Sequence, residues 1–563
     1  MTTSTAPAPA TRRGGARPRA GAPKGNLNAL TTGARSRRLA PVYRAVGPEG
    51  ARIVIRAITQ ATDDALTACP QDDTPRAARL RSRARAYAMK RVLTCAAAIT
   101  TDLIHTHGLH PTLVRAFAPI WRGTDAVPPW LPAALATSPD QHTIKPAPPQ
   151  TALTPHTPEG HPILVSDTAL PLATYLDSAA STPLRPEALA AMRPYFDALS
   201  ANPSGHYASA RRAADAIARA HEQVAEVLGA IPEEIVICSG GTESINAAIK
   251  GVAFAQREAG VGAHIVTTAV EHHAVIESAR YLERFGFEVD LVPVDAHGRV
   301  DPADVIAALR DDTILVSVMY ANNEVGTVQP VAEIGRLLRE RARAGGRRIP
   351  FHTDAVQAAN ALPLDVDTLG VDLLSLSAHK FGGPQGAGVL YIRRGTPYLE
   401  LLSGGGQERQ RRSGTEDVPA AVGLATALTL AAAERDAFTH TTERLRARLL
   451  AGIQAALPEA QINGHPTERL PNLLHLCIDG VEGEAIVEAL DAEGFETSAG
   501  AACTSATWEP SHVLLAMDVP LELAIGSLRL SLWPTHTEAD IDRLVAALPL
   551  AVERARLASL PAL

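Results

Sequence analysis

A regular alternation of short apolar runs with longer helical stretches, from about residue 234 to residue 392, most constrains the fold of this chain. The helical stretches include Ser244–Glu258, Val275–Arg284 and Val331–Ala344. Strands that alternate with helices form a mainly parallel sheet with helices on its faces. We therefore expect an α/β fold with a mainly parallel, seven-stranded large domain. Its predicted strands are Glu234–Cys238, His264–Thr268, Glu288–Pro293, Thr313–Met319, Ile349–Thr353, Leu373–Ser377 and Gly388–Ile392.

The pattern of predicted secondary structure differs on both sides of this region. Residues 437–563 combine helical stretches with apolar runs at Asn472–Ile478 and Ser527–Leu532, which predict a smaller α+β domain. Prolines interrupt residues 136–171, and a chain so rich in proline is typical of an extended linker. The large domain is therefore predicted to cover residues 172–436.

The N-terminal part of the chain differs from the rest in charge. Residues 1–150 contain 21 Lys and Arg against 8 Asp and Glu, whereas the remaining residues contain 32 and 52. Residues 1–40 are basic and poor in large apolar side chains, so we expect a disordered arm. Residues 41–135 are rich in Ala, Leu and Arg at helical spacing and predict a small helical domain of unknown role. This basic region could bind nucleic acid through phosphate contacts or simply be solvated.

Composition excludes several classes of protein. The chain has five cysteines at irregular spacing, which argues against a disulfide framework or a zinc cluster and fits a reducing cytoplasm. It has no run of 18 apolar residues, so we expect no membrane span, and no apolar signal core follows the basic N-terminus. A cytoplasmic enzyme without a resident metal fits these features.

Three segments at predicted strand ends combine residues suited to chemistry. Ser239–Ser244 is a glycine-containing loop before a helix, which fits either a phosphate site or an ordinary turn and cap. Asp354 ends a strand where ligands bind in open α/β sheets, and its carboxylate could pair with a pyridine nitrogen or cap a helix. Lys380, flanked by Ser, His and glycines, could form a Schiff base or be a surface lysine.

Together with further motifs, these segments resemble cysteine desulfurases of the bacterial IscS/NifS type, in the class V aminotransferase superfamily. The resemblance covers residues 175–558. Its motifs are Tyr175–Ala180, Ala201–Gly205, Thr268–His273, Ala321–Gly326, Arg412–Thr415 and Ala502–Ala506, besides the three segments above. It implies the fold type I of enzymes that depend on pyridoxal 5′-phosphate.

The resemblance also implies a role for each matching residue. Lys380 corresponds to the lysine that holds the cofactor, Asp354 to the partner of the pyridinium nitrogen, and His272 to the histidine on the cofactor ring. The other cofactor contacts implied are Gly241, Thr242, Asn323, Gln357, Ser377 and His379. Thr415 corresponds to a threonine that reaches the phosphate of a partner subunit, which implies a homodimer. Arg529 would bind the carboxylate of the substrate, and Asn202 would be a second substrate-binding residue.

Cys503 narrows the implied reaction to sulfur transfer. It lies in a stretch of small residues, Thr497–Ala506, which suits an exposed and reactive thiol. The resemblance implies that L-cysteine becomes L-alanine and that Cys503 carries the sulfur as a persulfide to an acceptor protein. An iron–sulfur cluster contact through Cys503 stays open, as do iron–sulfur assembly, tRNA modification and DNA modification as destinations. A selenocysteine lyase or another class V enzyme is the alternative.

Overall fold

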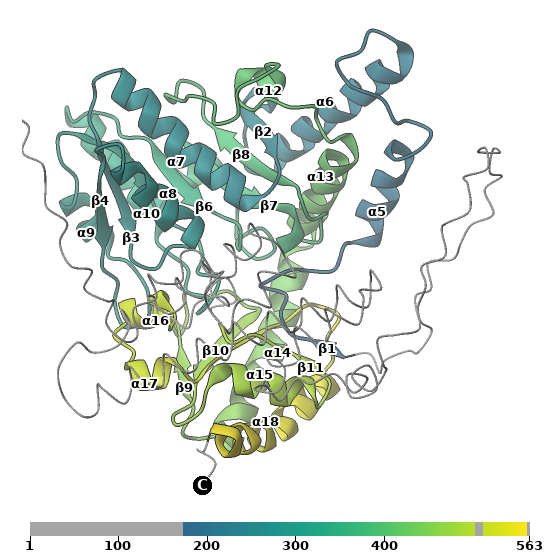
Figure 1. Cartoon of the computed structure of the whole chain (residues 1–563), viewed down its shortest axis with the longest axis vertical. Coiled ribbons are helices and arrows are strands. Elements are labelled where there is room, and N and C mark those ends of the chain that lie inside the picture. The colour runs from purple at the N-terminus through teal and green to yellow at the C-terminus, as the bar shows by residue number, and fades with distance from the viewer. Residues whose placement is uncertain (1–172, 501–509, 560–563) are drawn as a thin grey trace, which may run out of the picture. The chain divides into compact units, whose positions relative to one another are not determined.

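The computed structural model describes residues 173–500 and 510–559. The predicted basic arm, helical N-terminal domain and proline-rich linker lie outside these residues, and so does Cys503. The described part contains two sheets of three or more strands, each with its own apolar core. Figure 1 shows the larger sheet above the smaller one.

The larger sheet has seven strands in the order β2-β8-β7-β6-β5-β3-β4. β8 runs antiparallel to its two neighbours, and all other neighbours are parallel. Every residue of the five strands β3, β5, β6, β7 and β8 is buried, as expected for a parallel sheet covered by helices on both faces. The predicted mainly parallel sheet is thus confirmed. Its strands are β2 (Ile235–Cys238), β3 (His264–Thr268), β4 (Glu288–Val292), β5 (Thr313–Ser317), β6 (Phe351–Asp354), β7 (Leu373–Ser377) and β8 (Gly388–Ile392).

Helices cover both faces of this sheet, because successive strand residues point to opposite sides. Ile235 packs on one face and Val236 on the other. One face is covered mainly by α6 (Ala208–Leu228), α9 (Pro302–Ala307), α10 (Val331–Arg343), α11 (Val366–Leu369) and α13 (Val418–Ala433). The other face is covered by α7 (Gly241–Glu258) and α8 (His273–Glu283). The shorter α5 (Pro186–Met192) packs on α13, and α12 spans Gln407–Gln410.

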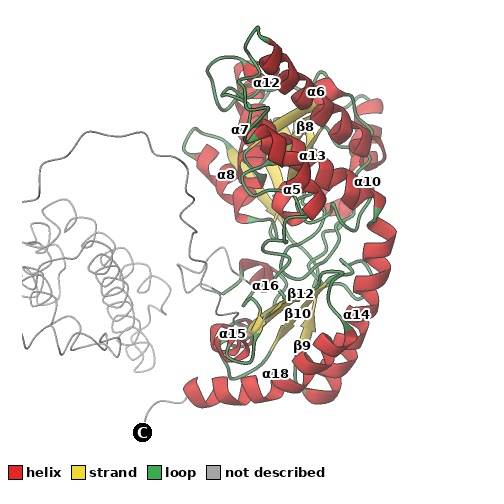
Figure 2. Cartoon of the chain, turned by 90° about the vertical axis from the view of Figure 1, so that its right-hand side faces the viewer, coloured by secondary structure: helices red, strands yellow, loops and turns green. Residues whose placement is uncertain are grey.

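The C-terminal layer is built on the antiparallel sheet β12-β10-β9. Its strands are β9 (Gln461–Asn463), β10 (Leu473–Cys477) and β12 (Ser527–Ser531), and its helices are α14 (Arg435–Ala456), α15 (Gly483–Asp491), α16 (His512–Ala516), α17 (Leu521–Ala524) and α18 (Glu538–Ser559). Figure 2 shows α14 running from the level of the large sheet down to this layer. The two strands predicted here are therefore present, within one residue at each end.

One short strand joins the start of the described chain to this C-terminal layer. β1 (Thr174–Tyr175) pairs in parallel with β11 (Phe495–Glu496), and Leu176 is buried in the C-terminal core. The first residues of the range predicted as the large domain thus pack with the smaller layer. This contact places the segment after β1 between the two sheets.

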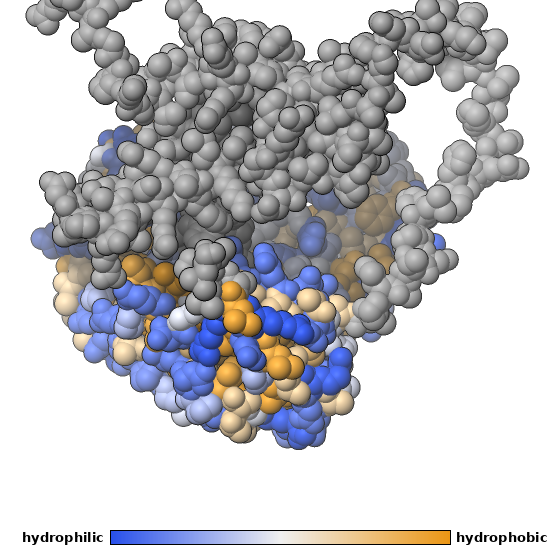
Figure 3. All heavy atoms as spheres, turned by 60° about the horizontal axis from the view of Figure 1, so that its bottom comes forward, coloured by the Kyte–Doolittle hydropathy of each residue, from blue (hydrophilic) through white to orange (hydrophobic). Residues whose placement is uncertain are grey.

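The surface of the C-terminal layer is mostly polar. Figure 3 shows that its visible face is largely hydrophilic, with scattered apolar patches. Arg448 of α14 pairs with Asp542 of α18 across this layer at 2.7 Å, whereas Leu550 and Leu557 of α18 are exposed. Such exposed ion pairs contribute little to stability, so the layer depends mainly on its apolar core.

Candidate active site

Lys380 comes directly after strand β7, in a 3₁₀ turn spanning Ala378–Lys380. Its Nζ donates hydrogen bonds to the carbonyl oxygens of Ala179, at 2.6 Å, and Ala180, at 2.8 Å. The side-chain amide of Asn360 donates to the carbonyl oxygen of Lys380 at 2.8 Å and fixes its backbone. The amine is therefore held at the carboxyl edge of the large sheet, where ligands bind in folds of this kind.

Asp354 ends the neighbouring strand β6 and is 5% exposed. Its Oδ1 accepts a hydrogen bond from the backbone N–H of Val356 at 3.0 Å. Burial raises the pKa of Asp354 to about 6, although this hydrogen bond and the charge of Lys380 act in the opposite direction. A buried carboxyl of this kind is suited to hold a protonated ring nitrogen.

His272 is the N-cap residue of α8, and its ring accepts a hydrogen bond from the first turn of that helix. Its Nδ1 accepts a hydrogen bond from the backbone N–H of Ala274 at 3.1 Å. Because Nδ1 must be unprotonated to accept, the neutral ring carries its hydrogen on Nε2. Burial, together with the nearby charge of Lys380, lowers the pKa of His272 to about 4. His272 is therefore a neutral Nε2–H donor at physiological pH.

The first turn of α7 forms a cradle that fits an anion. α7 begins at Gly241, three residues earlier than predicted, so the N–H groups of Gly241 and Thr242 belong to its first turn. A Cβ added at Gly241 would lie 3.0 Å from Cγ2 of Val356 and 3.4 Å from Cβ of Ser377, a close approach at which these neighbours would have to shift by a few tenths of an ångström. His379 completes this side, and burial followed by the charge of Lys380 lowers its pKa to about 4.

Arg529 lies on the opposite side of the cavity and comes from β12 of the C-terminal layer. It is 2% exposed. Its guanidinium donates to Oδ1 of Asp177 at 2.6 Å, to the carbonyl oxygen of Asn323 at 3.0 Å and to that of Gly500 at 3.5 Å. A planar guanidinium fixed in this way is suited to bind a carboxylate.

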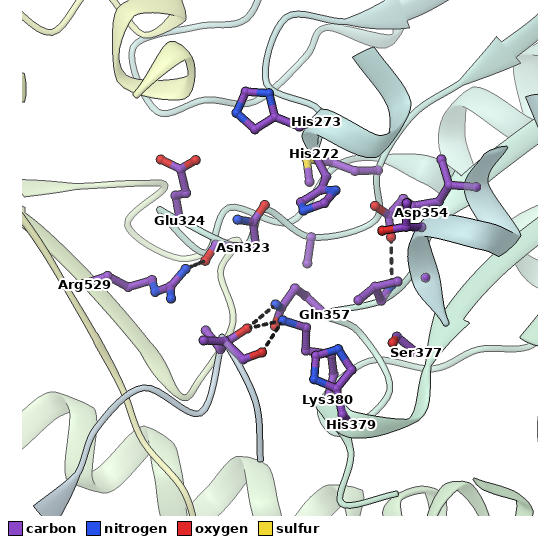
Figure 4. A pocket seen from close by; sticks show the side chains of 18 of the residues that line it. His272, His273, Asn323, Glu324, Asp354, Gln357, Ser377, His379, Lys380 and Arg529 are labelled. Atoms are coloured by element: carbon purple, nitrogen blue, oxygen red, sulfur yellow. Dashed lines mark hydrogen bonds between the residues drawn. The ribbon is translucent and has the colours of Figure 1, made fainter. Parts of the chain in front are cut away.

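A cavity of about 380 Å³ joins these groups. Figure 4 shows Arg529 on one side and Asp354 and Ser377 on the other, with His272, Asn323 and Lys380 between them. Gln357 also lines the cavity and donates to the carbonyl oxygen of Ala179 at 2.8 Å. The sequence-predicted residues that the structure brings together here are Gly241, Thr242, His272, Asn323, Asp354, Gln357, Ser377, His379, Lys380 and Arg529.

Two of the predicted residues that the structure describes are not part of this cavity wall. Asn202 is exposed, and its Oδ1 accepts from the backbone N–H of Ser204 at 2.9 Å. Thr415 is exposed on the loop before α13. Cys503 lies outside the described residues, although Gly500, three residues before it, lines the cavity.

The structure adds cavity residues that the sequence motifs did not single out. His273, Glu324 and His512 line the same cavity, and the rings of His273 and His512 lie 4.6 Å apart. Ser511 donates a hydrogen bond to the buried carboxyl of Glu324. His273 and Glu324 lie within two of the quoted motifs, Thr268–His273 and Ala321–Gly326, whereas His512 lies outside every quoted motif.

A buried carboxylic acid, Glu271, lies behind His272. Its Oε1 accepts from the hydroxyl of Thr268 and the backbone N–H of Met319, both at 2.8 Å, and its carbonyl oxygen accepts from His512 at 2.8 Å. Burial raises the pKa of Glu271 to about 8, so it is a neutral acid at physiological pH. It joins the ends of β3 and β5 beneath the cavity.

Comparison with known proteins places the chain in a family. Residues 174–544 match the model of the class-V aminotransferases. The chain is 48% identical over 384 residues to the cysteine desulfurase IscS of Methanosarcina thermophila, covering 68% of this chain and 93% of that protein. The chain is a cysteine desulfurase family member. The resemblance found in its motifs is thereby confirmed.

Solved structures agree with this family membership. A NifS-like protein is similar with a TM-score of 0.63 and 36% identity, covering 68% of this chain and 99% of that chain. The structure of SspA in complex with cysteine is similar with a TM-score of 0.56 and 33% identity, covering 65% of this chain and all of that one. The predicted fold type I is thus confirmed for this cysteine desulfurase family member.

None of the helices in residues 173–500 and 510–559 is both long and apolar enough to span a membrane. Within the same residues, no group of three or more His, Cys, Asp or Glu side chains is arranged to hold a metal ion.

Proposed function

We propose that this chain converts L-cysteine to L-alanine and transfers the sulfur to Cys503 as a persulfide. The observation that carries this proposal is one cavity with an amine and a buried carboxyl on one side and a guanidinium on the other. Lys380 and Asp354 supply the first two, and Arg529 supplies the third. Two similarities support the substrate: the relatives named cysteine desulfurase and the SspA structure with cysteine.

The cofactor we propose is pyridoxal 5′-phosphate, because the residues present fit it. The first turn of α7 offers the N–H groups of Gly241 and Thr242 to an anion, and Ser377 and His379 line the cavity beside them. Asp354 would hold the ring nitrogen, Gln357 and Asn323 would lie along the ring, and Lys380 would hold the cofactor covalently. When bound, this cofactor supplies an electron sink for carbanion chemistry.

The chain's own groups then bind the substrate and move its protons. Arg529 binds the carboxylate of cysteine and turns its Cα towards Lys380. The amine of Lys380 takes the Cα proton and returns a proton in the later steps. His272 donates its Nε2–H within the cavity rather than accepting a proton at Nδ1, which Ala274 occupies. The sulfur of the Cys503 thiolate bonds to the substrate sulfur while the carbon–sulfur bond breaks and leaves its electron pair on Cβ. Cβ then takes up a proton, so that alanine forms and Cys503 carries the persulfide.

The chain's connectivity is compatible with this role for Cys503. Gly500 lines the cavity and accepts from Arg529. Three residues of extended chain span at most about 11 Å, so Cys503 is tethered to the wall of the cavity. In iron–sulfur assembly, the thiol of Cys503 would also contact the iron–sulfur cluster.

We propose that two copies of the chain form a homodimer that shares its active sites. Thr415 is exposed and does not line the cavity of its own chain, as expected for a residue that reaches a partner's phosphate site. Asn202 is exposed in the same way, and its substrate contact is proposed on the family resemblance alone.

The proposal also covers the sulfur acceptor and the role of the N-terminal region. We propose a cytoplasmic enzyme that passes sulfur to an acceptor protein for iron–sulfur assembly or for tRNA or DNA modification. The division into an arm (1–40), a helical domain (41–135), a linker (136–171) and two catalytic domains (172–436 and 437–563) is part of the proposal. So is nucleic-acid binding by the basic region, whose net charge over residues 1–150 is +13.

The decisive experiment measures alanine formation from L-cysteine and from L-selenocysteine. We expect alanine from cysteine, and we expect Cys503→Ala to lose it while keeping the absorbance of bound cofactor. Alanine from selenocysteine only, or equal alanine from cysteine with Cys503→Ala, would contradict the proposal. A pull-down with wild-type protein and Cys503→Ala, analysed for persulfide-bearing partners, then identifies the acceptor.

A further inference from the structure

A left-handed turn stands out at the edge of the large sheet. Three consecutive residues other than glycine have positive φ: Glu408 at 47°, Arg409 at 57° and Gln410 at 63°. The left-handed region is unfavourable for side-chain-bearing residues, and runs of them are rare because each one crowds its own carbonyl. Such strain persists only where surrounding contacts impose it, and it gathers at functional sites. Figures 1 and 2 show this segment, α12, beside α6.

A buried pair holds the turn in place. Nε2 of His221, on α6, lies 2.8 Å from Oε2 of Glu408, and the two side chains are 4% and 3% exposed. Nδ1 of His221 lies 2.8 Å from the carbonyl oxygen of Ile217, which can only accept, so Nδ1 carries a hydrogen. Nε2 and the Glu408 carboxyl therefore share one proton between them. In either arrangement the pair is neutral overall and hydrogen-bonded, which makes it tolerable in the core.

The residues after the turn lead to the anion cradle of the proposed active site. Arg411 donates to the carbonyl oxygen of Glu233 at 2.9 Å. Arg412 then forms a two-pronged ion pair with Glu243, at 2.8 Å and 3.3 Å. Glu243 lies in the first turn of α7, directly after Thr242, and its Oε2 also accepts from the backbone N–H of Ser239 at 2.8 Å.

The charge of Glu243 explains why the cradle needs Arg412. A carboxylate next to a bound phosphate would repel it, because like charges at close range are unfavourable. Burial alone would raise the pKa of Glu243, but the Arg412 and Ser239 hydrogen bonds outweigh it and lower the pKa, so Glu243 is ionised. Arg412 cancels this charge only if it is held at Glu243, and the left-handed turn two residues earlier sets its position.

We propose that His221, Glu408 and the left-handed turn Glu408–Gln410 are positioning residues for the anion site: they hold Arg412 on Glu243 and so retain the phosphate group of the cofactor. This inference deepens the proposed function and rests on it. None of these residues lines the cavity. They act through Arg412, which pairs with Glu243 of the same chain.

The test compares two substitutions at one exposed residue. Gln410 is exposed, so neither change alters the core. Gln410→Gly accepts positive φ readily, whereas Gln410→Val opposes it strongly because valine is β-branched. We measure how fast pyridoxal phosphate leaves the full-length holoenzyme in cofactor-free buffer, from its visible absorbance. We expect Gln410→Val to release cofactor roughly tenfold faster than wild type and Gln410→Gly to match wild type.

Further variants separate positioning from general destabilisation. Arg412→Gln and Glu408→Leu should speed release as Gln410→Val does, and Glu408→Gln, which keeps a hydrogen bond to His221, should restore retention. Val224→Ala on α6 serves as a control, because it removes buried apolar atoms and leaves both residues of the pair in place. It should lower the melting temperature but leave the release rate unchanged.

The outcomes distinguish the inference from the function on which it rests. Release at the wild-type rate by Gln410→Val or by Arg412→Gln would overturn the inference. Equal acceleration by Val224→Ala would also overturn it, since the effect would then be general. If wild-type protein takes up no pyridoxal phosphate at all, the proposed function itself is wrong.

Discussion

The guanidinium of Arg529 and the carboxylate of Asp177 form an ion pair of 2.6 Å between residues 352 positions apart in the sequence. Arg529 comes from the C-terminal layer, and Asp177 lies on the segment after β1. The carbonyl oxygens of Ala179 and Ala180, on the same segment, accept hydrogen bonds from Lys380. The segment therefore links the two groups that would hold substrate and cofactor. Their separation depends on how β1 pairs with the C-terminal layer.

Removing Asp177 should destabilise the protein. In Asp177→Ala the buried guanidinium of Arg529 keeps two carbonyl acceptors but loses its counter-charge. Breaking a fully buried pair costs about 3–5 kcal/mol, and because Asp177 is partly exposed we expect about 2 kcal/mol. Urea unfolding of the cofactor-free protein measures this difference. Asp177→Asn keeps an acceptor and should cost less, so equal losses in the two variants would contradict the role of charge.

Replacing Arg529 by lysine should weaken substrate binding more than turnover. An ammonium cannot reproduce the two-pronged geometry of a guanidinium on a carboxylate. We expect Arg529→Lys to raise KM for cysteine about tenfold or more, with a smaller change in kcat. Cysteamine, which lacks the carboxylate, is the control: wild type and variant should use it equally poorly. A variant that impairs both compounds to the same degree would show that Arg529 does not bind the carboxylate.

Asp354 should destabilise the cofactor-free protein at neutral pH. Its pKa is raised from 3.8 to about 6, so its contribution to stability is present below the lower value and is lost as pH rises through the higher one. Asp354→Asn removes this loss and should stabilise the cofactor-free protein by up to roughly 3 kcal/mol at pH 7.5. The same variant should form alanine about a hundredfold more slowly, because an amide cannot hold a protonated ring nitrogen by charge. If Asp354→Asn were less stable than wild type and fully active, the prediction would be wrong.

Much of the fold could be predicted because its strands are buried on both faces. All five residues of β5 are buried, and the centre of this strand is the apolar run Ile314–Val316. Strand ends were less predictable: β6 starts at Phe351 rather than Ile349, because Pro350 has no N–H to donate to the ladder. Asp354 and Lys380 could be predicted as site residues because each comes at the end of a recognisable strand.

The cavity wall was predictable only where a motif was continuous in the sequence. His512 contacts the ring of His273 because α16 packs near the start of α8, and nothing in the local pattern of either segment indicates this. Asp177 and Arg529 meet through the pairing of β1 with β11, strands of two residues that carry almost no signal. Tertiary packing decides such contacts.

His272 should have separable roles in stability and catalysis. As an N-cap it satisfies the N–H of Ala274, and asparagine can do the same. His272→Asn should therefore keep the wild-type stability, whereas His272→Ala should lose about 1 kcal/mol, measured by urea unfolding. Both variants should lose activity. In labelled wild-type protein, nuclear magnetic resonance should show hydrogen on Nε2 and no titration of this ring between pH 5.5 and 9, since its pKa is about 4. Titration within that range would contradict the locked tautomer.

The buried acid Glu271 should control how stability depends on pH. Its pKa is raised from 4.5 to about 8, so its contribution is fully present below pH 4.5 and is lost as pH rises through 8. Glu271→Gln resembles the neutral acid in shape, because its amide oxygen can accept from Thr268 and Met319 as Oε1 does. The variant and wild type should therefore be about equally stable at pH 5, and the variant should be more stable at pH 9. Exposed Glu553→Gln controls for the loss of a surface charge and should change neither value. Denaturant unfolding of cofactor-free protein at several pH values checks this, and parallel stability curves for wild type and Glu271→Gln would show that Glu271 keeps the same protonation state in the folded and unfolded chain.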